Sequence, residues 1–436
     1  MHFAILGTED LIDAYGTTYT SYKLYCNGTY HGSARYREFA DLHNGLRNHF
    51  NGSLPSFPPK KMFNLSALEV NARRAQLEKY MQNLGQLPEA VYSAPLQDFL
   101  KKLILRSAHD LDASDLQVFL LNGSAISLQL DPKTSADEVL EAVCRDIKLP
   151  LELTNYFALY LAREDLPAKY IPFKKFAPFE YPFACLHLNS PPNGLSRPKL
   201  RIILKKSYWD AEFDTEILDS PSRVGINLLF VETVDAINRG WIVPTSEQKA
   251  QLEHLQSKGS RREFVQLARN IKGYGSVHFG PAVVDYPSPG TRTVPYLTGK
   301  DFVCPVNVGG KQEAVFRIVR MRCWRLCLSE TFRSGGPAER SPDTASLMFE
   351  YLMAREQLQW VTVVSEEAVW MSACLQSMVE ELMMKKSGKR IEKWEKKVRN
   401  GGETNGRTES LSVSVTVTRN VRSDNVAFEG IGNDDL

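Results

Sequence analysis

The chain has 436 residues, enough for two to four domains with their own cores. Apolar residues make up 43% and charged residues 24%, as in ordinary globular proteins, and the net charge of +2 gives no global attraction to nucleic acid. No apolar run approaches the ~18 residues that a membrane span needs, and the N-terminus lacks the pattern of a secretory signal. Any membrane contact is therefore expected to be peripheral.

The cysteine pattern and the missing catalytic motifs exclude several classes of protein. The seven cysteines are odd in number and scattered, which favours a reduced cytosolic compartment over a disulfide framework. Cys323 and Cys327 alternate with apolar residues as in a strand, and no four zinc ligands cluster. The sequence holds no P-loop, no His-Glu-x-x-His and no Gly-x-Ser-x-Gly. We therefore predict no enzyme activity, no cofactor and no metal site.

The first unit, residues 1–107, combines strands with helices. Alternating residues predict strands over 17–25 and 30–36, joined by an Asn-Gly hairpin turn. The spacing of apolar residues then predicts helices, which are expected over 38–50, 67–83 and 96–105.

Basic residues flank a Pro-rich loop in this unit. Arg35 precedes Tyr36 at the end of the second strand, the segment 54–61 ends in lysines that include Lys60, and Arg73 lies on the next helix. A guanidinium binds phosphate through two parallel hydrogen bonds, and a lysine adds a compact charge. The pattern therefore predicts a site for a multiply charged phosphate head group, although each element alone is typical of an ordinary surface loop.

These three elements, in this order, resemble the fingerprint of a phox-homology (PX) domain. The resemblance implies that Arg35 binds the 3-phosphate of phosphatidylinositol 3-phosphate and that Tyr36 stacks on the inositol. Lys60 would meet the 1-phosphate, and Arg73 would bind the 4- and 5-hydroxyls. Arg37 departs from the family pattern, and it is expected to add a phosphate contact or to widen specificity. Two further cations are expected to be solvated neighbours, namely Lys61 and Arg74.

Two further units follow a short polar linker. Residues 114–190 read as a hairpin, a helix capped by Thr134 and a buried strand over 156–161, an order that resembles a ubiquitin-like β-grasp fold. The pattern from 202 to 274 is helical, so we assign residues 200–274 to a small helical bundle. Its clearest helices are expected over 224–239, 246–255 and 260–271.

The next unit, residues 275–386, returns to short strands. The strongest cover 315–324 and 358–364, and a helix capped by Ser365 is expected to run to about residue 386. A strand-rich unit closed by one helix resembles a phosphotyrosine-binding (PTB) or pleckstrin-type sandwich.

A β-grasp lobe, a helical lobe and a PTB-like lobe in sequence resemble a FERM domain. We therefore predict an α+β multidomain protein in which a PX domain precedes a three-lobed FERM domain and a disordered tail, residues 387–436. A PX domain followed by a FERM domain resembles the endosomal PX-FERM sorting nexins.

This resemblance implies a peptide site on the PTB-like lobe. Such lobes bind Asn-Pro-x-Tyr or Asn-x-x-Tyr segments by adding them as a strand beside the last helix. The matching positions are Trp324 on the edge strand and Val379 and Met383 on the helix, where a spacing of four places the last two on one face. The alternative, that all three belong to the core, is the ordinary expectation for isolated residues of these types.

The tail carries opposite charges at its two ends. Residues 385–399 hold eight basic residues, and residues 424–436 hold four acidic and no basic ones. Asn425 and Phe428 have the Asn-x-x-aromatic form that the FERM groove reads, so we hypothesise that the tail occupies its own groove. The resemblance further implies that the acidic end with Leu436 docks onto a retriever-type recycling complex.

The family resemblance implies a cytoplasmic adaptor on the early endosome membrane. It would carry receptors such as LDL-receptor-family members and β integrins back to the cell surface and away from lysosomes, as a monomer without nucleic acid. Two alternatives stay open, a lipid-anchored FERM scaffold that links membrane to the cytoskeleton, and an enzyme with an unrecognised site. Binding of a Ras-like GTPase to the β-grasp lobe is a further open expectation.

Overall fold

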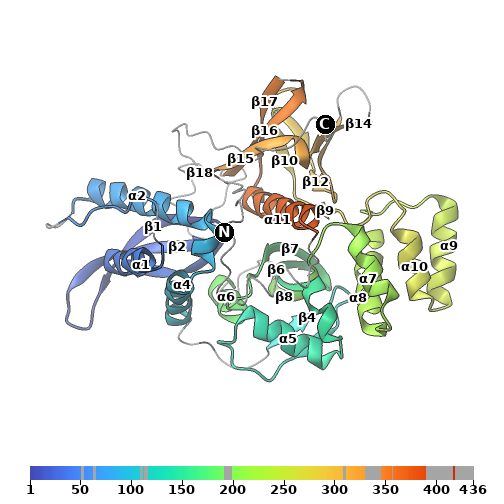
Figure 1. Cartoon of the computed structure of the whole chain (residues 1–436), viewed down its shortest axis with the longest axis horizontal. Coiled ribbons are helices and arrows are strands. Elements are labelled where there is room, and N and C mark those ends of the chain that lie inside the picture. Colours follow the sequence, from blue (N-terminus) through green and yellow to red (C-terminus); the bar gives the residue numbers. More distant parts are fainter. Residues whose placement is uncertain are drawn as a thin grey trace.

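The computed structural model describes residues 1–50, 54–61, 65–108, 111, 116–190, 199–307, 311–328, 345–355, 357–388 and 416–417. Four units surround one long helix, α11 (Ala368–Lys386), as Figure 1 shows. Each unit corresponds to one of the expected lobes.

The N-terminal unit is a three-stranded antiparallel sheet covered by helices. Its strands lie in the order β1-β2-β3, and its helices include α2, whose N-cap residue Ser66 forms a capping box with Glu69. The strands and helices are β1 (Phe3–Ile12), β2 (Thr18–Cys26), β3 (Thr29–Arg35), α1 (Tyr36–His49), α2 (Ala67–Gly85), α3 (Pro88–Val91) and α4 (Ala94–Ser107). The expected hairpin and three helices are confirmed, whereas β1 had not been predicted because only its first half is buried.

The second unit is a five-stranded sheet in the order β5-β4-β8-β6-β7, packed with helices. Its elements are β4 (Gln117–Phe119), β5 (Ala125–Ser127), α5 (Ala136–Asp146), η1 (Leu151–Tyr156), β6 (Phe157–Leu166), β7 (Lys169–Lys175), α6 (Pro182–Asn189) and β8 (Lys199–Lys206). The helical pattern expected from residue 202 is wrong at its start, because β8 is the central strand of this sheet. A short apolar run in a central strand cannot be told from a buried helix by periodicity. The cap of α5 is Ser135 rather than Thr134, whose hydroxyl donates to the Asp131 carbonyl.

The third unit is helical, as expected. It contains η2 (Ala211–Phe213), α7 (Asp214–Asp219), α8 (Arg223–Asn238), α9 (Ser246–Ser257) and α10 (Arg261–Ala268). Phe264 and Ile242 are buried at the centre of its own small core.

The fourth unit packs two sheets against α11. One sheet has the order β11-β10-β17-β16-β15-β18 and the other the order β14-β13-β12-β9. Their strands are β9 (Val277–His278), β10 (Ala282–Val284), β11 (Thr291–Thr293), β12 (Tyr296–Leu297), β13 (Asp301–Asn307), β14 (Lys311–Arg317), β15 (Met321–Leu328), β16 (Ala345–Ala354), β17 (Gln357–Val364) and β18 (Thr416–Val417).

Two expectations for this unit need correction. The single strand expected over 315–324 is divided by the 3-10 turn η3 (Ile318–Arg320), which passes the chain from one sheet to the other. Helix α11 begins at Ala368 after Glu367, and Ser365 instead accepts a hydrogen bond from the Glu367 N–H in the preceding turn.

Buried polar contacts join the N-terminal unit to the second unit. Lys174 is fully buried, pairs with Glu180 at 2.8 Å and donates to the Thr29 hydroxyl at 2.9 Å. Asn189 accepts from the Tyr30 N–H at 2.9 Å and donates to the Tyr30 carbonyl at 3.0 Å. Because buried groups of this kind are costly when unpaired, the contacts favour one relative placement of the two units.

Candidate functional site

The basic site lies where β3 passes into α1. The Arg35 guanidinium carbon lies 3.1 Å from the centre of the Tyr19 ring, and one of its nitrogens is 3.8 Å from Asp13. The Tyr36 hydroxyl donates to the Pro58 carbonyl at 2.8 Å, which fastens the Pro-rich loop beside the arginine. Arg73 approaches from α2, with its guanidinium carbon 4.6 Å from the centre of the Tyr36 ring.

Arg73 carries an unsatisfied donor. Its Nη2 atom is buried and has no hydrogen-bond partner in the part of the chain that the structure describes. Burial raises the pKa of the neighbouring Tyr22, and Arg73 acts against that rise. A buried donor without a partner costs about 1–3 kcal/mol, so this group is suited to a ligand oxygen.

The remaining cations differ in their surroundings. Lys60 is exposed at the end of the loop, whereas Lys61 pairs with Glu69 at 2.9 Å. The Arg37 side chain is 89% exposed and lies 3.9 Å from Asp41 one turn along α1. The structure thus brings Arg35, Tyr36 and Arg73 together and leaves Arg37 directed to solvent.

Arg74 is not the solvated neighbour that was expected. It is buried, and its Nη1 atom lies 2.5 Å from the Ile5 carbonyl and 3.0 Å from Glu78. It joins α2 to β1, so its role is structural.

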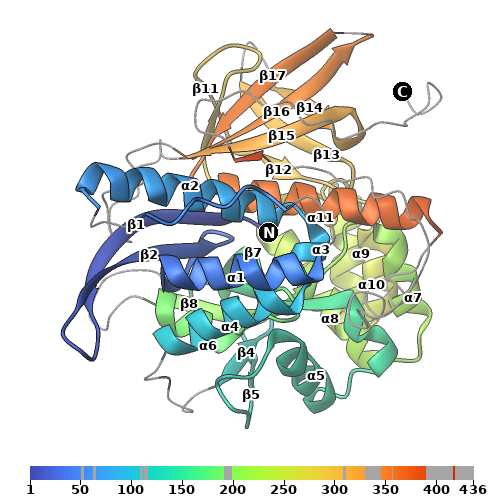
Figure 2. The ribbon, with the colours of Figure 1, turned by 60° about the vertical axis from the view of Figure 1, so that its left-hand side comes forward.

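Apolar side chains are exposed on the same unit. Ile12 is 71% and Tyr15 is 92% exposed at the tip of the β1–β2 hairpin, and Leu68 is 80% exposed in the first turn of α2. Figures 1 and 2 both place the hairpin tip and the start of α2 at the same outer end of this unit. Exposed apolar groups beside cations are typical of a surface that meets lipid.

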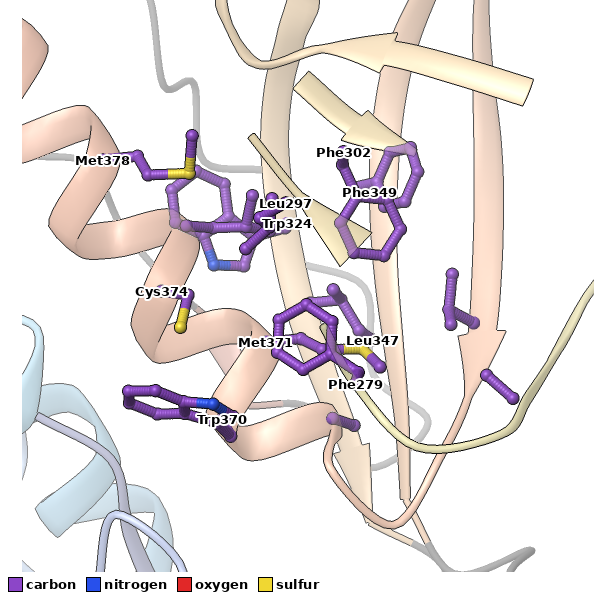
Figure 3. Packing of buried hydrophobic residues seen from close by; sticks show 14 of the residues in the cluster. Phe279, Leu297, Phe302, Trp324, Leu347, Phe349, Trp370, Met371, Cys374 and Met378 are labelled. Atoms are coloured by element: carbon purple, nitrogen blue, oxygen red, sulfur yellow. The ribbon is translucent and has the colours of Figure 1, made fainter. Parts of the chain in front are cut away.

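The three residues expected to bind peptide lie on β15 and α11 and belong to, or pack against, the same apolar cluster. Trp324 and Val379 belong to one buried cluster, in which each is 1% exposed, and the partly buried Met383 packs against it. Trp324 points from β15 toward α11, where Met378 and Cys374 lie (Figure 3). Its indole Nε1 donates to the Ser372 hydroxyl at 3.1 Å.

An extended segment of the chain already lies along this strand. Thr416 and Val417 form β18, which pairs in parallel with Arg325 and Leu326 of β15 and also lies near α2. The edge of β15 can therefore accept an added strand. The predicted tail residues Asn425, Phe428 and Leu436 lie outside the described residues.

Sequence reasoning missed a polar face that positions α11. Glu381 accepts the N–H groups of Trp209 and Asp210 at 2.8 and 2.7 Å, and burial raises the pKa of its carboxyl. The Trp209 indole donates to the Ser377 hydroxyl at 3.2 Å. Their i, i+4 spacing places Ser377 and Glu381 on one helical face, a signal present in the sequence.

The described residues contain no group of three or more His, Cys, Asp or Glu side chains that could hold a metal. Burial raises the pKa of Cys304 to about 12 and that of Cys144 to about 11, so these two thiols stay protonated near neutral pH.

Family comparisons identify the class of protein. The PX domain family matches residues 25–103. The remaining lobes match the sorting nexin 17/27/31 FERM F1 lobe at 114–209, the sorting nexin 17/31 FERM F2 lobe at 210–272 and the sorting nexin 17 FERM C-terminal domain at 275–383. The fold is thus a PX domain followed by a three-lobed FERM domain.

Individual relatives place the chain more closely. It is 36% identical to sorting nexin-17 of Danio rerio, with 100% of each chain covered. It is 30% identical to sorting nexin-31 of Homo sapiens, covering 90% of this chain and 88% of that one. The solved FERM and C-terminal domain complex of Drosophila Merlin aligns with a TM-score of 0.43 at 12% identity, covering 62% of this chain and 97% of that chain. The chain belongs to the PX-FERM sorting nexin family and is similar to sorting nexin-17 over its whole length.

Membership establishes the general role. The chain is an endosomal sorting adaptor that associates peripherally with membranes, and PX and FERM domains are adaptor domains rather than enzymes. Among the described residues, no helix combines the length and apolar character that crossing a bilayer requires.

Proposed function

We propose that the chain binds phosphatidylinositol 3-phosphate through its PX domain and Asn-Pro-x-Tyr or Asn-x-x-Tyr receptor tails through its FERM domain. On early endosomes, the two together would return receptors to the cell surface and keep them from lysosomes. When one site is bound to the membrane, the effective concentration of the second ligand at the other site rises. Two weak sites on one chain would therefore select membranes that carry both the lipid and the receptor tail.

The observation that carries the lipid half is the placement of Arg73 beside Tyr36 and Arg35, with its buried Nη2 left without a partner among the described residues. Arg35 would bind the 3-phosphate, Tyr36 would support the ring, Lys60 would meet the 1-phosphate, and Arg73 would bind the ring hydroxyls. A 4- or 5-phosphate would crowd Arg73, which disfavours more heavily phosphorylated lipids. Arg37 is exposed and would reach only a neighbouring phosphate.

Two adjacent lysines provide a matched test of the lipid site. We expect Lys60→Gln to weaken binding to vesicles that contain phosphatidylinositol 3-phosphate by about tenfold, since an ionised donor contributes about 1.5–3 kcal/mol. Lys61→Gln should have little effect, because Lys61 already pairs with Glu69. Equal effects of the two changes, measured by vesicle co-sedimentation, would contradict the assignment.

The peptide half is supported by the placement of Trp324 on β15 and of Val379 and Met383 on α11, within and against one apolar cluster. A receptor tail would add to the edge of β15 as a strand, where β18 now lies, and its tyrosine would enter beside α11. Met383 is partly exposed, so Met383→Ala tests the groove with less damage to the core than Trp324→Ala. We expect it to weaken an Asn-Pro-x-Tyr peptide about tenfold in calorimetric titration.

The tail supplies the last step of the proposal. Its acidic end with Leu436 would dock onto a retriever-type recycling complex, and Asn425 and Phe428 would compete with cargo for the groove. A residue added after Leu436 should abolish the recycling-complex contact and leave peptide affinity unchanged.

A further inference from the structure

One hydroxyl joins the membrane-binding unit to the candidate peptide groove. Ser372 on α11 is fully buried, and its Oγ lies 3.1 Å from the indole Nε1 of Trp324. The same Oγ lies 3.0 Å from Nε2 of His2, which belongs to the PX domain. Figures 1 and 2 both show the N-terminus beside α11.

The donors and acceptors of this chain of contacts match. An indole N–H is a donor only, so Ser372 accepts from Trp324 and keeps its own hydrogen to donate. Burial, aided by the neighbouring N-terminal amine, lowers the pKa of His2 to about 3, so its ring is neutral near pH 7. A neutral imidazole has one acceptor nitrogen, and we assign to His2 the tautomer with its proton on Nδ1, so that Nε2 accepts and the order runs from Trp324 to Ser372 to His2.

The PX domain itself holds His2 in place. The His2 N–H donates to the Asn27 side-chain oxygen at 2.8 Å, and the Asn27 N–H donates to the His2 carbonyl at 2.8 Å. The adjacent Gly28 lies against α11, since a Cβ atom at this position would lie 3.7 Å from Val369. The imidazole is thus presented to α11 by a turn that is itself packed on that helix.

We propose that His2 and Ser372 are positioning residues for Trp324, so that the docked PX domain is a structural part of the peptide groove. The inference rests on the proposed peptide site and names how that site is regulated. Release of the PX domain from α11 removes the acceptor of the Ser372 hydroxyl, and Trp324 loses its fixed orientation. Peptide affinity then depends on PX docking even where no lipid is present.

Four variants of the full chain test the coupling. We expect His2→Ala and Ser372→Ala each to weaken an Asn-Pro-x-Tyr peptide by about three- to tenfold, the range for one buried hydrogen bond. Because both act through the same hydroxyl, the double variant should bind no more weakly than either single variant. His2→Gln should restore most of the affinity, since its amide oxygen is again an acceptor.

Two controls separate positioning from general damage. His254→Ala alters an exposed histidine of α9 and should change nothing. Binding of all variants to vesicles with phosphatidylinositol 3-phosphate should stay as in the parent chain, because His2 is not part of the Arg35 site. Wild-type affinity in both single variants, or fully additive losses in the double variant, would overturn the proposal.

Failure of the proposed function gives a different result. If the parent chain binds no peptide, the peptide site itself is refuted. Amide hydrogen exchange over residues 321–328 then still tests the coupling, and it should be faster in His2→Ala than in His2→Gln. Equal exchange in the two variants would overturn the role of His2 whatever the peptide result.

Discussion

The two candidate sites differ in how ready they are to bind. At the candidate lipid site, the Arg35 side chain is 40% exposed and Arg73 has a donor without a partner among the described residues, so a ligand would complete these contacts. At the peptide site, Trp324 and Val379 are 1% exposed, and β18 lies along the strand edge. Lipid binding at the first site would thus need little rearrangement, whereas peptide binding at the second would have to displace or reorder part of the chain. A site of the second kind can be regulated by any change that alters the population of its closed state, in which Trp324 is buried and β18 lies along β15.

The largest expected contrast comes from removing one central residue at each site. Trp324→Ala should lower the free energy of unfolding by about 3–5 kcal/mol, because it empties a packed core position and leaves the Ser372 hydroxyl without its donor. Arg35→Ala should lower it by less than about 1 kcal/mol, since its ion pair with Asp13 is exposed. Urea denaturation checks both values, and similar losses would remove the contrast.

The sequence predicted the grouping of Arg35, Tyr36 and Arg73 better than the long-range contacts around it. Arg35, Tyr36 and Arg73 lie within about 40 residues, and a short motif of this kind keeps its geometry once its strand and helix form. The contact of His2 with Ser372 joins residues 370 positions apart, so no local pattern contains it. Strand β8 was missed because pairing partners distant in the chain, rather than its own periodicity, make it a strand.

Two adjacent arginines of α2 separate a lipid-binding role from a structural one. Arg73→Gln should weaken binding to vesicles with phosphatidylinositol 3-phosphate by about 30-fold, because a charge-assisted donor is lost. Arg74→Gln, one residue along α2, should instead reduce stability, since Arg74 is paired with Glu78 inside the domain. Vesicle binding and thermal unfolding of the two folded variants together distinguish an arginine that binds lipid from one that supports the fold. A lipid defect confined to Arg74→Gln would reverse the assignment.

Acid should destabilise the PX and FERM domains alike, because each holds a buried or half-buried histidine. Burial lowers the pKa of His31 in the PX domain and of His278 in the FERM domain to about 4, from about 6.5 when unfolded. A lowered pKa favours the neutral ring in the fold, so this stability is present above pH 6.5 and is lost as the pH falls toward 4. Each histidine should contribute about 1 kcal/mol of loss between pH 7 and pH 5.5.

A matched variant isolates one of these histidines. His278 stacks between Trp241 and Tyr296, with ring centres 4.9 Å apart on each side. His278→Phe keeps an aromatic ring in this stack and removes the titration, so its stability should fall less steeply with acid than that of the parent chain. Parallel curves in denaturant titrations at several pH values would show that His278 is not responsible.

Deleting the tail, which should give the smallest effect, tests whether the tail keeps the peptide site closed. Deleting residues 400–436 removes β18 together with Asn425 and Phe428, so an Asn-Pro-x-Tyr peptide no longer competes with the chain for β15. We expect a gain of about threefold in peptide affinity. The tail competes for β15 at an effective concentration of about millimolar, but it pairs only weakly with the strand, so its removal has a small effect. Replacing Phe428 with Ala in the full chain should give part of the same gain if the Asn-x-x-aromatic motif is the competitor. An unchanged affinity after the deletion would show that burial of Trp324 by its own lobe, and not the tail, keeps this site closed.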